Sequence, residues 1–327
     1  MKPKLLVARA MFTDELERLS GHFELELNQE DRIYTPQELS ERLQGKFGMI
    51  CTSSAKIDEN LLARTPGLKI ISTIAVGYDN FDLSACTKRG LMATNAPDVL
   101  NETTADFAWA LLMATARRVT EAEHFLRAGK WEKWSLDFFL GGDIHGSCLG
   151  ILGMGRIGQA IARRAAGFGM QVIYHNRSQL SPDIELAANR ARYVDKATLL
   201  RESDHLVLAL PYSLEAHHVI GAQELLQMKP SAHLINIARG GIVDDVALIQ
   251  ALERRQIAGA GLDVFEGEPR LHSGFLNLKN VVLTPHIASA SEKTRRAMLN
   301  RAIDNLIAAV NGQVPPDLLN PEVISSC

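Results

Sequence analysis

Three side chains of complementary chemistry stand at matching positions in the second half of the chain. Arg239, Glu268 and His286 each come after a short apolar run that has the length of a buried strand. An arginine can hold a carboxylate with two parallel hydrogen bonds, and a histidine can give a proton to a carbonyl oxygen. A carboxylate beside that histidine favours its charged form. These are the groups needed to reduce a 2-keto acid once a hydride is supplied.

Each of the three residues also has an ordinary explanation. Arg239 and Glu268 could be solvated surface charges, and His286 could be structural, as the typical one of the ten histidines is expected to be. Independent surface residues need not fall at successive strand ends, however, and ligands of open α/β sheets bind at those ends. The shared position therefore favours a common site.

A glycine-rich segment is suited to bind the hydride donor. Residues 149–152 have the pattern of a buried strand, and the segment Gly153-Met-Gly155-Arg156-Ile157-Gly158 leads from it into a helical pattern. Three glycines with this spacing, between a strand and a helix, form the dinucleotide-binding turn. The first glycine permits the turn, the second admits the pyrophosphate, and the third lets helix and strand approach. We expect the pyrophosphate at the helix N-terminus.

The end of the next strand indicates which dinucleotide is used. The run 171–174 is followed by His175, Asn176, Arg177 and Ser178, where an NAD enzyme usually has an acidic residue for the ribose 2′-hydroxyl. Arg177 offers a guanidinium to a 2′-phosphate, and the two residues beside it are neutral donors. The sequence thus predicts that NADP (NADPH) is preferred and that NAD is possible. The alternative is that Arg177 is a solvated surface charge.

Apolar runs alternate with helical patterns along nearly the whole chain, which predicts an α/β protein with parallel sheets and helices on both faces. The alternation stops near residue 100 and starts again near residue 148, so we expect two similar domains. The expected strands are 4–8, 47–52, 69–75, 91–93, 148–152, 171–174, 205–210, 233–237, 259–262 and 281–284.

Two long helical patterns lie outside this alternation. One extends from Glu102 to about residue 128, ends at Gly129 and is predicted to be a single helix. The other extends over 291–311; because no strand follows it, it can cross back and pack on the first domain. After the first helix, a loop carries four large aromatic side chains, which are too many for a bare surface: Trp131, Trp134, Phe138 and Phe139.

Composition excludes several classes of protein. The chain has 327 residues, 46% hydrophobic and 22% charged, with a net charge of −3, so neither nucleic acid nor an acidic membrane is an expected partner. No apolar run approaches the length of a membrane span, and the N-terminus does not resemble a signal peptide. The four cysteines lack metal-ligand spacing, so no metal site is expected. We expect them to be reduced thiols in a cytoplasmic protein: Cys51, Cys86, Cys148 and Cys327.

Four segments resemble the signatures of the D-isomer-specific 2-hydroxyacid dehydrogenases. They are residues 153–158, 236–244, 261–269 and 284–289. Within that family the chain is most similar to the glyoxylate/hydroxypyruvate reductases and the 2-ketogluconate reductases, a likeness carried largely by residues 72–82. The resemblance implies reduction of a small 2-keto acid to a D-2-hydroxy acid. It leaves open which acid is the substrate: glyoxylate, hydroxypyruvate, 2-ketogluconate or a phosphorylated ketogluconate.

The resemblance also implies roles for individual residues. Arg239 matches the substrate-binding arginine, Glu268 the acid that pairs with histidine, and His286 the proton donor. Asp263, which could otherwise simply bond loop amides, matches a residue near the nicotinamide carboxamide. The implied substrate contacts are Val76, Gly77, Arg239, His286 and Ser289, and the expected cofactor contacts are Thr104, Gly153, Gly155, Arg156, Ile157, Gly158, Asn176, Arg177, Ser178, Pro211, Ala238 and Asp263.

The family fold implies two Rossmann-like, doubly wound domains. A discontinuous, flavodoxin-like substrate domain would comprise residues 1–98 and 287–327, with the dinucleotide-binding domain at 99–286. Members are usually homodimers, so the aromatic loop is expected in the dimer contact; the alternative is that its rings fill the chain's own interdomain groove. Two other functions stay open: a nicotinamide-sensing regulator on the same scaffold, and a phosphoglycerate or formate dehydrogenase of the same superfamily.

Overall fold

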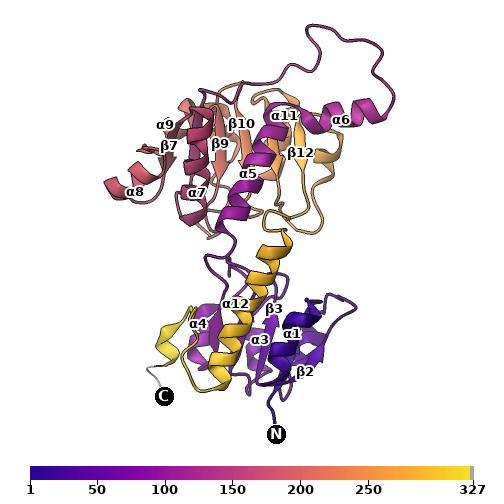
Figure 1. Ribbon diagram of the computed structural model, residues 1–327, viewed down its shortest axis with the longest axis vertical. Coiled ribbons are helices and arrows are strands. Elements are labelled where there is room, and N and C mark those ends of the chain that lie inside the picture. Colours follow the sequence, from indigo (N-terminus) through magenta and orange to yellow (C-terminus); the bar gives the residue numbers. More distant parts are fainter. Residues whose placement is uncertain (325–327) are drawn as a thin grey trace. The chain divides into compact units, whose positions relative to one another are not determined.

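The computed structural model describes residues 1–324 and divides into two units, each built on one parallel β-sheet (Figure 1). The first unit comprises Met1–Leu100 and the C-terminal segment from Ala290, and the second comprises Asn101–Ser289. The chain thus passes between units after residues 100 and 289, where the sequence analysis placed the passages after 98 and 286. The predicted fold class, two parallel-sheet α/β domains with the first one discontinuous, is confirmed.

The first sheet has the strand order β2-β1-β3-β4-β5, with every neighbouring pair parallel. This is the flavodoxin-like order. Its strands are β1 (Lys4–Val7), β2 (Glu24–Leu27), β3 (Gly48–Cys51), β4 (Ile70–Thr73) and β5 (Met92–Thr94). The helices of this unit are α1 (Thr13–Ser20), α2 (Pro36–Arg42), α3 (Glu59–Ala63), α4 (Leu83–Lys88), α12 (Glu292–Val310) and the short η3 (Pro321–Val323).

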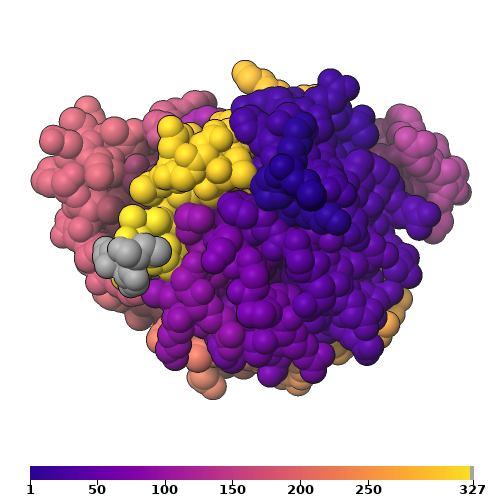
Figure 2. All heavy atoms as spheres, turned by 90° about the horizontal axis from the view of Figure 1, so that it is seen from below, coloured from indigo at the N-terminus to yellow at the C-terminus, as the bar shows by residue number. Residues whose placement is uncertain are grey.

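The last long helix, α12, returns to the first unit, as the sequence analysis predicted. It packs on β3, β4 and α1, and its buried Leu299, Ile303 and Leu306 join the core around Leu5 and Ile70. Figure 2 shows the C-terminal part of the chain, in yellow, beside the indigo N-terminal part. The helix therefore contributes a layer to a sheet whose strands all lie before residue 95 in the sequence.

The second sheet has the order β12-β11-β10-β9-β6-β7-β8, again entirely parallel. Counted from β6, this is the Rossmann order with one further strand, β12, beside β11. The strands are β6 (Cys148–Leu152), β7 (Gln171–His175), β8 (Arg192–Tyr193), β9 (His205–Leu208), β10 (His233–Asn236), β11 (Gly259–Leu262) and β12 (Val281–Leu283). The direction of winding reverses between β6 and β9, and ligands of such sheets bind at the carboxyl ends of the strands at that point.

The helices of the second unit cover both faces of its sheet (Figure 1). They are α5 (Asn101–Ala116), α6 (Val119–Arg127), α7 (Arg156–Ala165), η1 (Ala166–Phe168), α8 (Pro182–Ala187), α9 (Lys196–Glu202), α10 (Ala222–Gln227), α11 (Asp245–Glu253) and η2 (Ser273–Asn277). Each core cluster of the unit joins one face of the sheet to its helices.

The prediction of one helix from 102 to 128 was wrong, because two helices, α5 and α6, occupy this segment. Arg118 between them has a left-handed φ of 53°. The N–H of Gly142 donates to the carbonyl of Ala116 at 2.9 Å, and Nη1 of Arg118 donates to the carbonyl of Leu140 at 3.2 Å. The returning loop thus supplies a hydrogen-bond donor to the Ala116 carbonyl at the end of α5. The helical segment contains no glycine or proline that could have indicated this break.

Three of the four cysteines lie among the described residues. Burial raises the pKa of the Cys51 thiol to about 12 and that of Cys86 to about 11, while Cys148 is partly buried. These three thiols are free, and Cys327 lies outside the described residues. Among residues 1–324, no helix has the length and apolar character that a membrane crossing requires.

Candidate active site

The turn between β6 and α7 has the glycines that a dinucleotide needs. Gly153 has a φ of 99°, and a Cβ atom there would lie 2.7 Å from the carbonyl carbon of Ala209. A Cβ at Gly158 would lie 2.4 Å from the carbonyl oxygen of Gly153. A Cβ at Gly155, the N-cap of the ten-residue α7, would meet nothing within 4 Å. Two glycines are thus required by packing, and the third leaves open space at a helix N-terminus, which fits a pyrophosphate.

The end of β7 supports this turn from the side. Oδ1 of Asn176 accepts a hydrogen bond from the N–H of Met154 at 2.7 Å, and the hydroxyl of Tyr193 donates to the Asn176 carbonyl at 3.1 Å. The side-chain carbonyl of Asn176 therefore holds the glycine turn, a role that the sequence analysis did not assign to it. Arg177 and Ser178 are exposed, and their contact with a 2′-phosphate stays a prediction.

Glu268 and His286 form a hydrogen-bonded pair. Nδ1 of His286 lies 2.8 Å from Oε2 of Glu268, and the N–H of Phe265 donates to Oε1 of Glu268 at 2.9 Å. Burial acts to raise the pKa of Glu268, but the hydrogen bond and the charge of His286 outweigh it and lower that pKa. Because the carboxylate accepts a hydrogen bond from Nδ1–H, Nε2 is the nitrogen of His286 that stays available for proton transfer.

The backbone that carries His286 is held by Asp263, at the end of β11. The N–H of His286 donates to the Asp263 carbonyl at 2.9 Å, and His286 has a left-handed φ of 54°. The Asp263 carboxylate, which is fully buried, accepts hydrogen bonds from Oγ1 of Thr284 and from the N–H groups of Ile287 and Ala288. Burial raises the pKa of Asp263 against the lowering effect of these bonds. They are the loop-amide bonds of the simpler alternative, and a contact of Asp263 with the cofactor stays a prediction.

Arg239 lies at the end of β10, in a turn that packs against the segment before Glu268. A Cβ at Gly240 would lie 1.8 Å from the carbonyl oxygen of Phe265, so only glycine permits this approach. The charge of Arg239 contributes to the lowered pKa of Glu268. The structure therefore brings together the three side chains that the sequence analysis selected.

Asn236 shapes the Arg239 turn, and sequence reasoning did not select it as a site residue. Its Oδ1 accepts from the N–H of Ala238 at 3.0 Å, and its Nδ2 donates to the Arg239 carbonyl at 3.2 Å. The side chain is buried, with 2% of its surface exposed. A polar amide directly after the apolar residues Leu234 and Ile235 of the strand was the available signal.

The other residues predicted to contact substrate or cofactor are divided between the two units. Val76 and Gly77 follow β4 in the first unit, where Nδ2 of Asn95 donates to the Val76 carbonyl at 2.7 Å. The remaining contacts belong to the second unit, with Thr104 and Ala238 buried, Ile157 and Ser289 partly buried, and Arg156 and Pro211 exposed.

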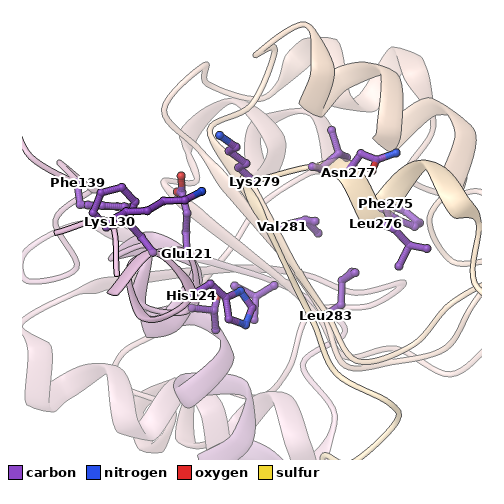
Figure 3. Close-up of a pocket in the computed structure, with 14 residues that line it drawn as sticks. Glu121, His124, Lys130, Phe139, Phe275, Leu276, Asn277, Lys279, Val281 and Leu283 are labelled. Atoms are coloured by element: carbon purple, nitrogen blue, oxygen red, sulfur yellow. The ribbon is translucent and has the colours of Figure 1, made fainter. Parts of the chain in front are cut away.

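A pocket of the second unit lies away from these residues, between α6 and β12. Figure 3 shows side chains of α6 and of the loop after it facing side chains of η2 and β12. The predicted aromatic loop is divided here: Phe138 and Phe139 pack on Phe125 with ring centroids 5.4 Å away, whereas Trp131 and Trp134 are 56% and 72% exposed. Half of the aromatic loop thus packs on its own unit, and half faces outward.

Comparison with known proteins gives one consistent family. A family model described as D-isomer specific 2-hydroxyacid dehydrogenase, NAD binding domain, matches residues 109–288. The chain is 47% identical to a glyoxylate reductase of Thermococcus gammatolerans, over 99% of this chain and 98% of that protein.

Solved structures agree with this family. A D-isomer-specific 2-hydroxyacid dehydrogenase from a Polaromonas species superposes with a TM-score of 0.90 at 36% identity, over 98% of this chain and 100% of that one. An NADPH-dependent glyoxylate/hydroxypyruvate reductase of Sinorhizobium meliloti, solved with NADP and malonate, has a TM-score of 0.87 at 33% identity, over 99% of this chain and 98% of that one.

Proposed function

Because the chain belongs to the D-isomer-specific 2-hydroxyacid dehydrogenase family, we propose that it reduces small 2-keto acids to D-2-hydroxy acids, with glyoxylate as the first substrate to test. The observation that carries the proposal is the arrangement of Arg239, Glu268 and His286 in the same unit as an open glycine turn. The curated relative at 47% identity is named a glyoxylate reductase.

The three side chains have distinct tasks in such a reduction. When bound, the nicotinamide supplies the hydride. Arg239 orients the substrate carboxylate with its guanidinium. His286 delivers a proton from Nε2 to the carbonyl oxygen, while Glu268 holds Nδ1 and stabilises the charged ring before the transfer. The backbone at Val76 and Gly77 in the first unit is assigned to the substrate carboxylate by resemblance.

NADPH is the proposed cofactor. No acidic side chain stands in the segment 175–178 at the end of β7, and the exposed Arg177 and Ser178 stand where a 2′-phosphate would be bound. The Sinorhizobium relative is described as NADPH-dependent and was solved with NADP.

We also propose that the protein is a homodimer. Trp131, Trp134, Leu136 and Leu140 are between 56% and 83% exposed and lie within ten residues of each other. A patch of this kind is typical of a protein contact. A second copy of the chain is the partner that the family resemblance implies.

A steady-state panel tests the function. Glyoxylate, hydroxypyruvate, 2-ketogluconate and a phosphorylated ketogluconate would each be assayed with NADPH and with NADH. We expect turnover of at least one of these acids, with a higher kcat/KM for NADPH than for NADH. NADPH binding without any turnover would instead support the nicotinamide-sensing alternative, and a tenfold preference for NADH would contradict the interpretation of Arg177.

A further inference from the structure

Two histidines and a glutamate of the second unit lie together outside the group of Arg239, Glu268 and His286. His217 and His218 belong to the loop after β9, and Glu266 belongs to the loop after β11. The two imidazole rings are stacked, with centroids 3.9 Å apart and planes inclined by 21°. Nε2 of His218 lies 2.9 Å from Oε1 of Glu266. One potential ligand atom from each residue lies within 4.8 Å of those of the other two.

The backbone holds both histidines in this arrangement. His218 has a left-handed φ of 52°, and its N–H donates to the Gly241 carbonyl at 2.7 Å. The hydroxyl of Tyr212 lies 3.2 Å from Nδ1 of His217. A Cβ at Gly241 would lie 3.3 Å from that same nitrogen, so a glycine there leaves room for the ring. The rings are therefore positioned by the turn that follows β10, although neither histidine belongs to it.

Further carboxylates surround the cluster. Nδ1 of His218 lies 3.9 Å from Oδ2 of Asp244, on the side of the ring away from Glu266. Asp244 is itself fixed, because it accepts from the N–H of Ala247 at the start of α11. The N–H of Glu266 donates to Asp245 at 3.2 Å. A histidine that binds a metal through one nitrogen commonly donates a hydrogen bond from the other to a carboxylate, and Asp244 is the carboxylate that faces that nitrogen of His218, at 3.9 Å.

We propose that His217, His218 and Glu266 bind a divalent transition-metal ion of the zinc type. Imidazole nitrogens and a carboxylate oxygen are ligands that Zn²⁺ accepts, at about 2.0–2.2 Å from the ion. Two such ligands of a tetrahedral ion lie about 3.3 Å apart, so the ion replaces the proton between His218 and Glu266 after a shift of a few tenths of an ångström. His217 is exposed and completes the set by a small rotation, and the fourth position is left to water.

The ion would act as a clamp between two loops and would take no part in the chemistry at His286. It joins the loop after β9 to the loop after β11, which are two strands apart in the sheet. Binding is therefore expected to stabilise the folded chain without being needed for hydride transfer. The inference does not depend on the proposed reductase activity.

Calorimetric titration of the full chain with Zn²⁺, after removal of metals by a chelator, tests the proposal. We expect one ion per chain and a rise in Tm on binding. His217→Gln changes an exposed side chain and should weaken binding by about 10-fold or more, and Glu266→Gln should do the same. Loading with Co²⁺ gives a second readout, because the visible absorption of the ion reports nitrogen and oxygen ligands in the wild type and is lost in both variants.

Two control variants locate the ion. His124 and Glu123, with Nε2 and Oε2 3.9 Å apart, form a histidine–glutamate pair that has no second histidine beside it among residues 1–324, so His124→Gln should leave the titration unchanged. His286→Gln should also leave it unchanged. The proposal is overturned if the wild type binds no Zn²⁺, if His217→Gln and Glu266→Gln retain its affinity, or if His286→Gln abolishes binding, which would place the ion on the Glu268–His286 pair.

Discussion

The hydrogen bond between His286 and Glu268 decides which nitrogen of the imidazole can act on a substrate. Because Nδ1 faces the carboxylate at 2.8 Å, the ring orientation is fixed by the protein and Nε2 is left free. The buried carboxylate of Asp263 holds the side-chain hydroxyl of Thr284 before His286 and the backbone N–H groups of Ile287 and Ala288 after it. A proton donor that is oriented at the side chain and at the backbone loses little freedom in the reaction.

Replacing His286 by Gln should lower kcat for reduction by roughly 10²–10⁴, the usual contribution of a general acid. Glu268→Gln keeps the imidazole but removes the negative charge beside it, so the pH above which the reduction rate falls should move to lower values. Rate profiles from pH 5 to 9 would measure both effects. Cofactor affinity, followed by nicotinamide fluorescence, serves as the control and should change little. An unchanged pH profile in Glu268→Gln would refute the role of the pair.

Arg239→Lys tests the planar guanidinium separately from its charge. Lysine retains the positive charge but cannot offer two parallel N–H groups to a carboxylate. We expect a higher KM for the keto acid together with a lower kcat, measured by initial rates with saturating cofactor. A KM equal to that of the wild type would show that Arg239 does not hold the substrate carboxylate.

Cofactor preference is also decided at single residues. Arg177→Asp puts a carboxylate where a ribose 2′-hydroxyl would be bound and where a 2′-phosphate would be repelled. The ratio of kcat/KM for NADPH to that for NADH should therefore fall below one, as measured by initial rates with a fixed keto acid. Arg192→Asp, an exposed arginine on the neighbouring β8, is the matched control and should leave the ratio unchanged.

At the scale of elements, β9 and β10 place two histidines side by side at their first residues. His205 and His233 are register partners in the parallel pair, and their rings stack at 5.1 Å. Nδ1 of each ring is buried and has no hydrogen-bond partner among residues 1–324. Burial and the neighbouring His205 lower the pKa of His233 from 6.5 to about 4. Both rings are therefore neutral in the folded chain near neutral pH.

This pair predicts that the second unit is sensitive to acid. Below pH 6.5, His233 is protonated in the unfolded chain but stays neutral in the folded chain until about pH 4. The free energy of unfolding therefore falls across that window as the pH decreases. His233→Gln removes this difference in protonation. Between pH 8 and pH 5 the variant should therefore lose about 2 kcal/mol less of its free energy of unfolding than the wild type does. Urea midpoints at the two pH values measure the effect, and equal losses in both proteins would contradict it.

At the scale of the whole molecule, the exposed part of the aromatic loop is the feature that a single chain leaves unexplained. Phe138 and Phe139 pack against Phe125, so the loop is anchored to its own unit on one side. Trp134 and Leu136 are 72% and 83% exposed. The proposed homodimer would cover these side chains.

Light scattering at micromolar concentration should therefore give twice the 35.9 kDa mass of one chain. Introducing charge with Trp134→Glu and Leu136→Glu together should shift the mass toward that of the monomer, because a buried unpaired charge opposes association. Leu186→Glu, at a 62% exposed position on α8, is the control and should not change the mass. A wild type that scatters as a monomer would exclude the dimer.

The sequence alone determined the fold class and the catalytic candidates, because both depend on local patterns. Strand and helix periodicity predicted two parallel sheets, and parallel strands bring their carboxyl ends to one edge. Arg239, Glu268 and His286 could therefore be expected together without coordinates. The glycines at 153, 155 and 158 were equally predictable, since the turn between a strand and a helix imposes its own requirements.

Only the tertiary structure decided what depends on contacts between distant segments. The break between the two helices at Arg118 goes with a loop that returns to Ala116, and no residue within the helical segment indicates it. Asn176 turned out to hold the glycine turn, and Asp263 the loop of His286. His217 and Glu266 are 49 residues apart and meet because β9 and β11 lie on either side of β10. Local sequence patterns do not indicate strand order or which distant segments meet, so these contacts could be found only in the folded chain.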